Sequence, residues 1–107
     1  MDDAVILYTT WPDAETAEAF GRLAVEERLA ACATLIPGVQ SIYHWRGEIE
    51  SSTETLLLLK TGPDQLDALQ TRLLELHTYQ TPEFLVLGVE GVSHAYLDWL
   101  TASLRQP

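Results

Sequence analysis

Residues 39–60 read VQSIYHWRGEIESSTETLLLLK, and this stretch decides the fold. Its side chains alternate between two faces up to Trp45, as they do in a β-strand. Arg46 and Gly47 then form a connection short enough for a hairpin turn. Residues 49–60 follow as the return strand and end in a run of leucines. The stretch therefore predicts a long antiparallel hairpin.

Toward the N-terminus, residues 31–36 are typical of a further strand, which the Pro-Gly pair at 37–38 interrupts. Proline has no backbone N–H, so this pair predicts a β-bulge or a sheet edge. Residues 13–29 predict a helix, with Asp13 as its N-cap and apolar side chains at helical spacing. The apolar residues 4–9 predict a first, buried strand.

Toward the C-terminus, residues 62–76 predict a second helix, with Pro63 in its first turn and leucines along one face. Residues 77–82 end this helix. Residues 84–89 predict another buried strand, and Ser93 is the expected N-cap of a short last helix.

The order of these elements predicts an α+β protein with a ferredoxin-like fold. A β-α-β-β-α-β chain of this kind builds an antiparallel sheet with both helices on one face, and here a C-terminal helix follows. A chain of 107 residues is expected to form a single domain, 1–107. The other face of the sheet would expose too much apolar surface to water, so we expect a partner subunit or the last helix to cover it.

The chain is acidic, with 16 Asp and Glu against 6 Lys and Arg and a net charge of −10. This charge argues against a nucleic acid or an anionic membrane as the main partner and leaves cations, small polar ligands and proteins. Cys32 is the only cysteine, so no intrachain disulfide forms. The N-terminus is acidic and no apolar run is long enough to span a membrane, so we expect a cytoplasmic protein.

The side chains that most often bind metals are Cys32, His44, His77 and His94, and they lack the short fixed spacing of a metal motif. His44 near the hairpin tip and His94 after the last cap are expected at the surface. Cys32 is expected to be a buried, inert thiol. His77 follows the second helix, where the helix dipole favours a cationic imidazole without any ligand.

Residues 77–83, HTYQTPE, hold more polar chemistry than any other loop. An imidazole, a phenol and a carboxylate suit a small ligand or an ion, whereas Pro82 by itself explains an extended segment after a helix. Lys60, the only lysine, either pairs with Glu83 or Glu54 or binds an anionic ligand. No nucleophile elbow and no closely spaced Cys–His pair is present, so no enzyme is predicted.

Several segments together resemble the CutA family of divalent-cation tolerance proteins. They are 30–38 (AACATLIPG), 41–50 (SIYHWRGEIE), 57–61 (LLLKT), 77–83 (HTYQTPE) and 96–100 (YLDWL). The match runs in order through nearly the whole chain. The resemblance implies a ferredoxin-like fold in a trimeric assembly, with the hairpin and the sheet edges between subunits. It also implies a likeness to the trimeric PII signalling proteins, which bind small effectors between subunits.

The family is described as copper-binding, and in its enteric members a cysteine of the first strand and two consecutive histidines after the second helix are the ligands. In this chain Tyr8 and Leu76 stand at the cysteine and first histidine positions, His77 is retained, and Thr78 replaces the usual proline. The resemblance implies a non-enzymatic, cytoplasmic homotrimer that binds Cu²⁺ or another divalent cation at His77. Three copies would converge there with carboxylates or Cys32.

The alternative is a signalling module that binds a small molecule in a cleft between subunits. The family motifs suggest the residues of such a cleft, which are Cys32, Trp45, Lys60, Tyr79 and Glu83. Under either hypothesis the partners are further copies of this chain and a divalent cation or a small molecule, with neither nucleic acid nor membrane involved.

Overall fold

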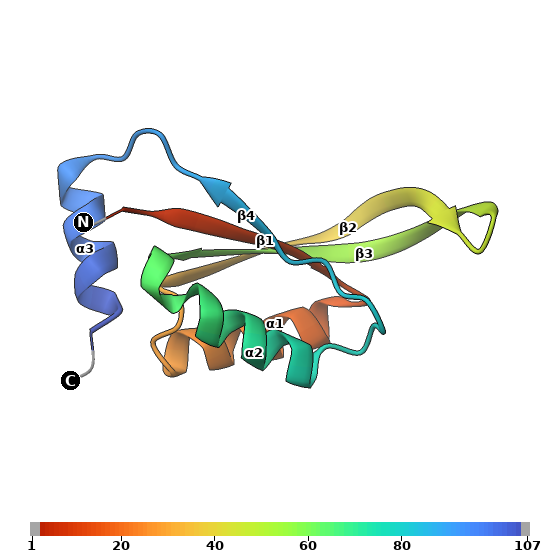
Figure 1. Cartoon of the computed structure of the whole chain (residues 1–107), viewed down its shortest axis with the longest axis horizontal. Helices are drawn as coiled ribbons and strands as arrows, with labels where there is room; N and C mark the ends of the chain where they lie inside the picture. Colours follow the sequence, from red (N-terminus) through yellow and green to blue (C-terminus); the bar gives the residue numbers. More distant parts are fainter. Residues whose placement is uncertain (1–2, 106–107) are drawn as a thin grey trace.

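The computed structural model describes residues 3–105 and shows a four-stranded sheet with two helices packed on one face (Figure 1). The elements are β1 (Val5–Trp11), α1 (Ala14–Glu26), β2 (Cys32–Trp45), β3 (Glu48–Thr61), the 3₁₀ turn η1 (Pro63–Gln65), α2 (Leu66–Leu76), β4 (Leu85–Gly88) and α3 (His94–Ser103). The strand order is β2-β3-β1-β4, and every neighbouring pair is antiparallel. The predicted ferredoxin-like α+β fold is confirmed.

The hydrophobic core lies between the sheet and the helices α1 and α2. Its largest fully buried members are Leu7, Trp11, Leu57, Leu59, Leu69 and Leu73. Burial of each leucine contributes roughly 1.5–3 kcal/mol relative to exposure. Helix α1 begins as the sequence predicts, because the Asp13 carboxylate accepts a hydrogen bond of 2.8 Å from the backbone N–H of Thr16. It ends at Glu26, earlier than expected, and Arg28 then takes a positive φ of 59°.

Residues 37–38 form the predicted bulge in β2, which is also an edge strand of this sheet. Ile36 pairs with Leu56, and the next pair is Val39 with Glu54, so the register shifts across the bulge. Gly38 has a φ of 76°, which favours glycine. Before the bulge the even-numbered side chains of β2 lie on the face away from the helices, and after it the odd-numbered ones do.

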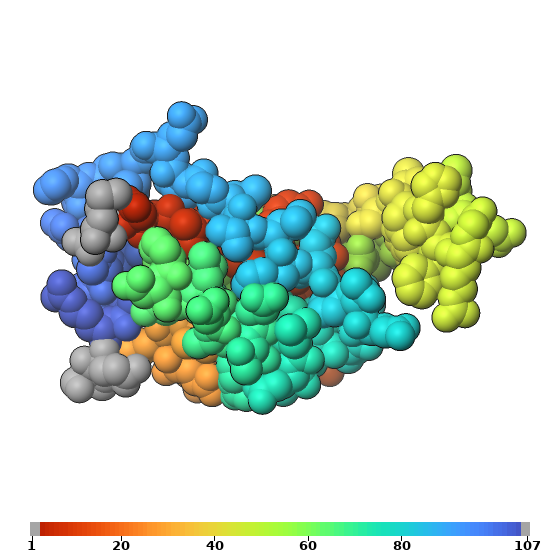
Figure 2. Space-filling model, viewed as in Figure 1, coloured from red at the N-terminus to blue at the C-terminus, as the bar shows by residue number. Residues whose placement is uncertain are grey.

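The β2–β3 hairpin closes at the predicted turn. Trp45 pairs with Glu48, and both residues between them have positive φ, 51° at Arg46 and 83° at Gly47. Two successive positive φ values are typical of the type I′ turn, whose twist matches that of the strands. The hairpin extends well beyond the helices (Figures 1 and 2), and the longest dimension of the molecule is 45 Å.

Two strands differ from their predicted form. The strand predicted at 84–89 is the shorter β4, and its side chains are exposed rather than buried: Leu85, Val86 and Leu87 are 49%, 43% and 45% exposed. The prediction is wrong because β4 lies at an edge and pairs only with β1. Strand β1 continues to Trp11, which is buried, where the sequence suggested a break.

The face of the sheet away from α1 and α2 carries apolar side chains that no element covers, and we call it the open sheet face. Strand alternation and register assign to it Ile6, Tyr8, Ile36, Leu56, Leu58, Leu85 and Leu87. Helix α3 lies beside the end of the sheet, where Leu100 packs with Ala4 and Ala31 (Figure 1). The last helix therefore does not provide the expected cover. In residues 3–105 no helix has the length and apolarity to cross a membrane.

Candidate functional site

A groove of about 840 Å³ lies where the open sheet face meets the hairpin and the segment 78–83. Its walls come from β1, β2, β3 and that segment, and Trp45, Tyr79 and Glu83, all predicted site residues, line it. The other lining residues are Tyr8, Thr10, Ser41, Ile42, Tyr43, Glu50, Ser52, Glu54, Thr78, Gln80 and Thr81. No Lys, Arg or His is among them, so three carboxylates give the groove a negative charge.

Glu54 is the most deeply placed of these carboxylates, with only 7% of the residue exposed. Its Oε2 accepts a hydrogen bond of 2.6 Å from the hydroxyl of Tyr79. Within residues 3–105, none of the ion pairs involves Glu54. With so little of the residue exposed, the carboxylate loses part of its hydration, and one neutral donor offsets this loss only in part.

Tyr79 and Glu83 both titrate abnormally in this setting. Burial, and then the hydrogen bond to Glu54, raises the pKa of the Tyr79 phenol, so the hydroxyl remains a donor. Burial also raises the pKa of Glu83, and the negative charge of Glu54 adds to the rise. A 3.4 Å hydrogen bond from the Thr10 hydroxyl opposes it. Burial and the neighbouring carboxylate therefore both disfavour the ionised form of Glu83.

His77 lies behind the groove and makes hydrogen bonds through both ring nitrogens. Nδ1 accepts from the backbone N–H of Tyr79 at 3.1 Å, so the ring proton is on Nε2, which donates to the carbonyl of Thr10 at 2.8 Å. Burial lowers the pKa of His77, which outweighs the opposing effects of the Thr10 bond and the Glu54 charge. The cationic imidazole suggested by the helix dipole is therefore wrong, and the neutral ring connects the segment that follows α2 to β1.

A column of rings, stacked except for the tilted pair of His77 and Tyr79, connects the core to the groove. The ring centroids of Phe20 and Trp11 are 5.1 Å apart, those of Trp11 and His77 3.9 Å, and those of His77 and Tyr79 4.6 Å. Stacking of this kind adds roughly 0.5–1.5 kcal/mol per pair beyond burial. The column holds the Tyr79 hydroxyl against Glu54 from a rigid base.

Lys60 and Cys32, both proposed as cleft residues, lie away from the groove. They face each other in the β2–β3 ladder, where the Lys60 ammonium donates to the Thr34 hydroxyl at 3.2 Å and contacts the Cys32 sulfur at 3.8 Å. The predicted pairing of Lys60 with Glu54 or Glu83 is wrong, because six residues of strand place Lys60 about 20 Å from Glu54. Cys32 is a free thiol and is partly exposed rather than buried.

The remaining candidate metal ligands do not gather. His44 and His94 are exposed, as predicted. Among the residues that the structure describes, no three His, Cys, Asp or Glu side chains converge on a point where a metal ion would sit. Within residues 3–105, a metal site formed by one chain alone therefore has at most two His, Cys, Asp or Glu ligands.

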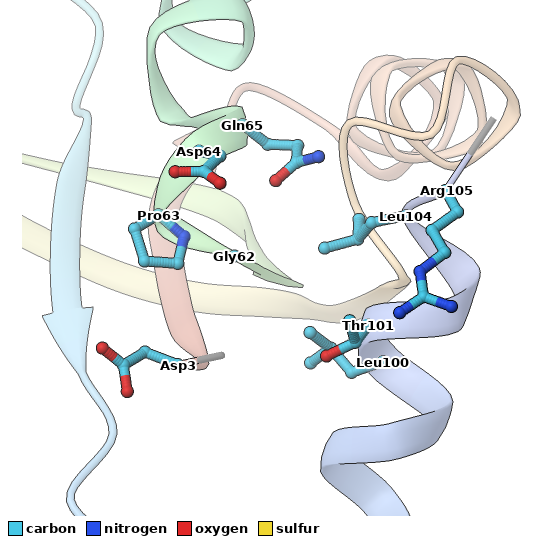
Figure 3. A pocket seen from close by; sticks show the side chains of 9 residues that line it. All are labelled: Asp3, Gly62, Pro63, Asp64, Gln65, Leu100, Thr101, Leu104 and Arg105. Atoms are coloured by element: carbon cyan, nitrogen blue, oxygen red, sulfur yellow. The ribbon is translucent and has the colours of Figure 1, made fainter. Parts of the chain in front are cut away.

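A second, smaller cavity of about 170 Å³ lies between the start of β1, η1 and α3 (Figure 3). Asp3 and Asp64 lie on one side of it, and the Arg105 guanidinium extends from the end of α3 on the other. None of the predicted site residues lines this cavity.

Sequence reasoning missed Glu54, Tyr43 and Tyr8 as groove residues. The one available signal was the position of Glu54 on the same strand face as two leucines, Leu56 and Leu58, where a carboxylate is unusual. Tyr43 gave no such signal, because only the shifted register after the bulge places it on the face of Glu54.

Fold and groove define this chain as a ferredoxin-like α+β protein with an acidic, aromatic groove beside an uncovered sheet face. The family described as "CutA1 divalent ion tolerance protein" matches residues 5–103. The chain belongs to this family.

Proteins related to this chain are similar to it over nearly its full length. The divalent-cation tolerance protein CutA of Pectobacterium atrosepticum is 46% identical over 103 residues, which are 96% of this chain and 94% of the relative. The structure of the divalent ion tolerance protein CutA1 from Ehrlichia chaffeensis has a TM-score of 0.94 at 27% identity and covers 99% of both chains. That of the periplasmic divalent cation tolerance protein CutA from Archaeoglobus fulgidus has a TM-score of 0.92 at 28% identity, covering 95% of this chain and 99% of that one.

Proposed function

We propose that this chain acts in divalent-cation tolerance, as its relatives are named, by binding a cation in the groove. The observation that carries the proposal is Glu54, a residue that is 7% exposed and whose carboxylate has the Tyr79 hydroxyl, but no basic side chain, beside it in the groove. A bound cation would compensate the desolvation of this carboxylate. Glu83 supplies a second negative charge in the same groove.

The cation in this proposal is Cu²⁺ or another divalent metal ion, and His77 is the second candidate ligand. Its lowered pKa favours the neutral imidazole that a metal requires. A metal at Nδ1 would have to replace the hydrogen bond from the Tyr79 N–H. Carboxylates suit Mn²⁺ or Mg²⁺, whereas an imidazole favours Cu²⁺. The preferred metal therefore distinguishes binding by the groove carboxylates from binding by His77.

Calorimetric titration with Cu²⁺ and with Mn²⁺ tests this assignment. Glu54→Gln, which keeps the shape and removes the charge, should weaken binding by about tenfold or more. His77→Gln should leave the affinity unchanged, and Glu26→Gln on the exposed surface of α1 controls for the loss of one net charge. Loss of Cu²⁺ binding in His77→Gln alone would transfer the site to His77 and overturn the groove assignment.

We further propose that the protein is a homotrimer in which neighbouring copies cover the open sheet face. This face carries seven apolar side chains, with Cys32, Thr34 and Lys60 beside them, and neither the helices α1 and α2 nor α3 packs on the seven. An uncovered apolar sheet face is a typical subunit interface. Tyr8 belongs both to this face and to the groove, so a neighbouring copy would form the outer wall of the groove.

The proposed role is binding in the cytoplasm rather than catalysis. In residues 3–105 no serine, threonine or cysteine side chain is hydrogen-bonded to a histidine side chain, the arrangement that activates a nucleophile. The free thiol of Cys32 suits a reducing compartment. Fractionation of cells that produce the tagged chain checks the location, and recovery with periplasmic proteins would contradict it.

A further inference from the structure

The walls of the groove differ in chemistry from a site built for a bare metal ion. Four aromatic residues line it, Tyr8, Tyr43, Trp45 and Tyr79, and Trp45 is 44% exposed. Aromatic faces do not ligate hard cations, but they attract organic ammonium and guanidinium groups. The volume of about 840 Å³ is also far larger than one metal ion needs.

Trp45 already interacts with an organic cation of its own chain. The guanidinium carbon of Arg46 lies 5.5 Å from the centroid of the Trp45 ring, within the range of a cation–π contact. Arg46 does not line the groove, whereas Trp45 does. The ring is therefore exposed where the hairpin meets the groove and has the electrostatic character that a cationic ligand needs.

The carboxylates of the groove are spread along a line. Glu50 and Glu54 lie on the same face of β3 with Ser52 between them, a separation of about 13 Å along the strand. Glu83 joins Glu54 at the inner end, where Thr10 and Tyr79 contact the two carboxylates. Glu54 is more than nine-tenths buried and has no cation beside it. A ligand with positive charges at both ends of an aliphatic chain matches this pattern.

We propose that the groove binds a linear aliphatic polyamine, with one ammonium group between Glu54 and Glu83 and another beside Glu50. Tyr43 pairs with Glu50 and Trp45 with Glu48, so these two rings face the outer ammonium group and the methylene groups next to it. This inference rests on the proposed function, since it specifies the class of cation that the same groove takes. The charged ends provide attraction and the aromatic wall provides the preference over small inorganic ions.

Calorimetry with spermidine as the probe, at fixed ionic strength, tests the inference. Glu54→Gln should weaken spermidine binding by about tenfold, since it removes the buried charge. Trp45→Leu should weaken it by about threefold to tenfold, since it removes the ring and keeps an apolar side chain. Glu26→Gln is the control for Glu54→Gln, because it changes the net charge by the same amount. Trp99→Leu is the control for Trp45→Leu, because Trp99 is also exposed but lies on α3. Both controls should bind spermidine as the unchanged protein does.

Equal weakening by Glu54→Gln and Glu26→Gln would show general attraction to an acidic protein and overturn the inference. Circular dichroism establishes that each variant is folded, and Glu83→Gln replaces Glu54→Gln if the latter is not. Titration of the same samples with Mn²⁺ separates the two proposals. Metal binding that depends on Glu54, without any spermidine binding, would overturn the polyamine inference and leave the proposed function standing. Binding of neither probe would overturn both.

Discussion

The hydrogen bond from Tyr79 to Glu54 is the most informative single contact in the groove. At 2.6 Å it has the length of a charge-assisted bond, and within residues 3–105 it is the only hydrogen bond to the side chain of Glu54, a residue that is 7% exposed. In the protein without a bound cation, the Tyr79 hydroxyl is the group that stabilises the Glu54 carboxylate.

Tyr79→Phe should therefore lower the free energy of unfolding by about 1–3 kcal/mol, because it leaves Glu54 without its donor. Urea denaturation at fixed protein concentration measures the change. Tyr43→Phe is the matched control, since the Tyr43 hydroxyl makes only an exposed 3.3 Å bond to Ser52. Equal losses in the two variants would contradict a special role of the Glu54 bond.

His77 makes stability depend on pH in a defined direction. Its pKa is lowered in the folded chain, so between that value and about 6.5 the unfolded chain binds more protons. The stability that the neutral ring contributes is present above pH 6.5 and is lost as the pH falls through the folded-state pKa. Glu83, whose pKa is raised, acts in the opposite sense, because its stabilising protonated form is favoured at low pH.

The difference in unfolding free energy between the unchanged protein and His77→Gln isolates this effect. It should shrink steadily from pH 7 to pH 5 in urea titrations. His44→Gln, at an exposed histidine near the hairpin tip, serves as the control for the loss of one histidine. A difference for His77→Gln that does not change with pH would contradict the lowered pKa of His77.

At the scale of elements, the bulge at residues 37–38 determines which side chains meet. By changing the face on which the odd-numbered side chains of β2 lie, it places Tyr43 opposite Glu50, on the face of β3 that also carries Glu54. Without the shifted register, Ile42 and His44 would occupy that face and the groove would lack its aromatic wall. A local irregularity of the strand thus assembles a site from residues far apart along the hairpin.

The turn at Arg46 and Gly47 gives a prediction for backbone strain. Gly47→Ala should lower the free energy of unfolding by about 1 kcal/mol, because an L-residue is strained at its φ of 83° although a Cβ there meets no atom within 4 Å. Gly88→Ala in β4 also meets no atom within 4 Å and has no positive φ, so it should be neutral or slightly stabilising. Thermal unfolding of both variants measures the contrast, and equal effects would contradict it.

Local features were predictable from the sequence, and features set by tertiary neighbours were not. The hairpin turn, the bulge and the N-caps Asp13 and Ser93 depend on a few adjacent residues, and all are confirmed. The exposure of β4 and the position of α3 depend on which other elements pack against them. The hydrophobic periodicity of a segment carries no information about those neighbours. The polar residues of the 77–83 loop are adjacent in sequence, so the sequence indicates a candidate site there. Glu54 approaches this loop only in the folded chain, so the sequence does not indicate its role.

For the whole molecule, the open sheet face leads to a prediction of mass. Light scattering coupled to size exclusion should give three times the chain mass of 11.9 kDa. Leu58→Glu places a charge in the middle of this face and should reduce the mass toward that of one chain. Leu74→Glu, at a leucine that is 58% exposed on α2, should not. A monomeric unchanged protein, or a trimer that survives Leu58→Glu, would contradict the proposed interface.

The β2–β3 hairpin also bears on the order in which the chain folds. Its strands are joined by only two residues, whereas β1 pairs with segments far along the chain. Closing a short loop costs less entropy, so the hairpin is expected to be formed in the transition state while β1 is still docking. Gly47→Ala should then slow refolding more than it speeds unfolding in stopped-flow measurements. The aromatic wall of the groove would exist before the segment that carries Tyr79 and Glu83 arrives to close it.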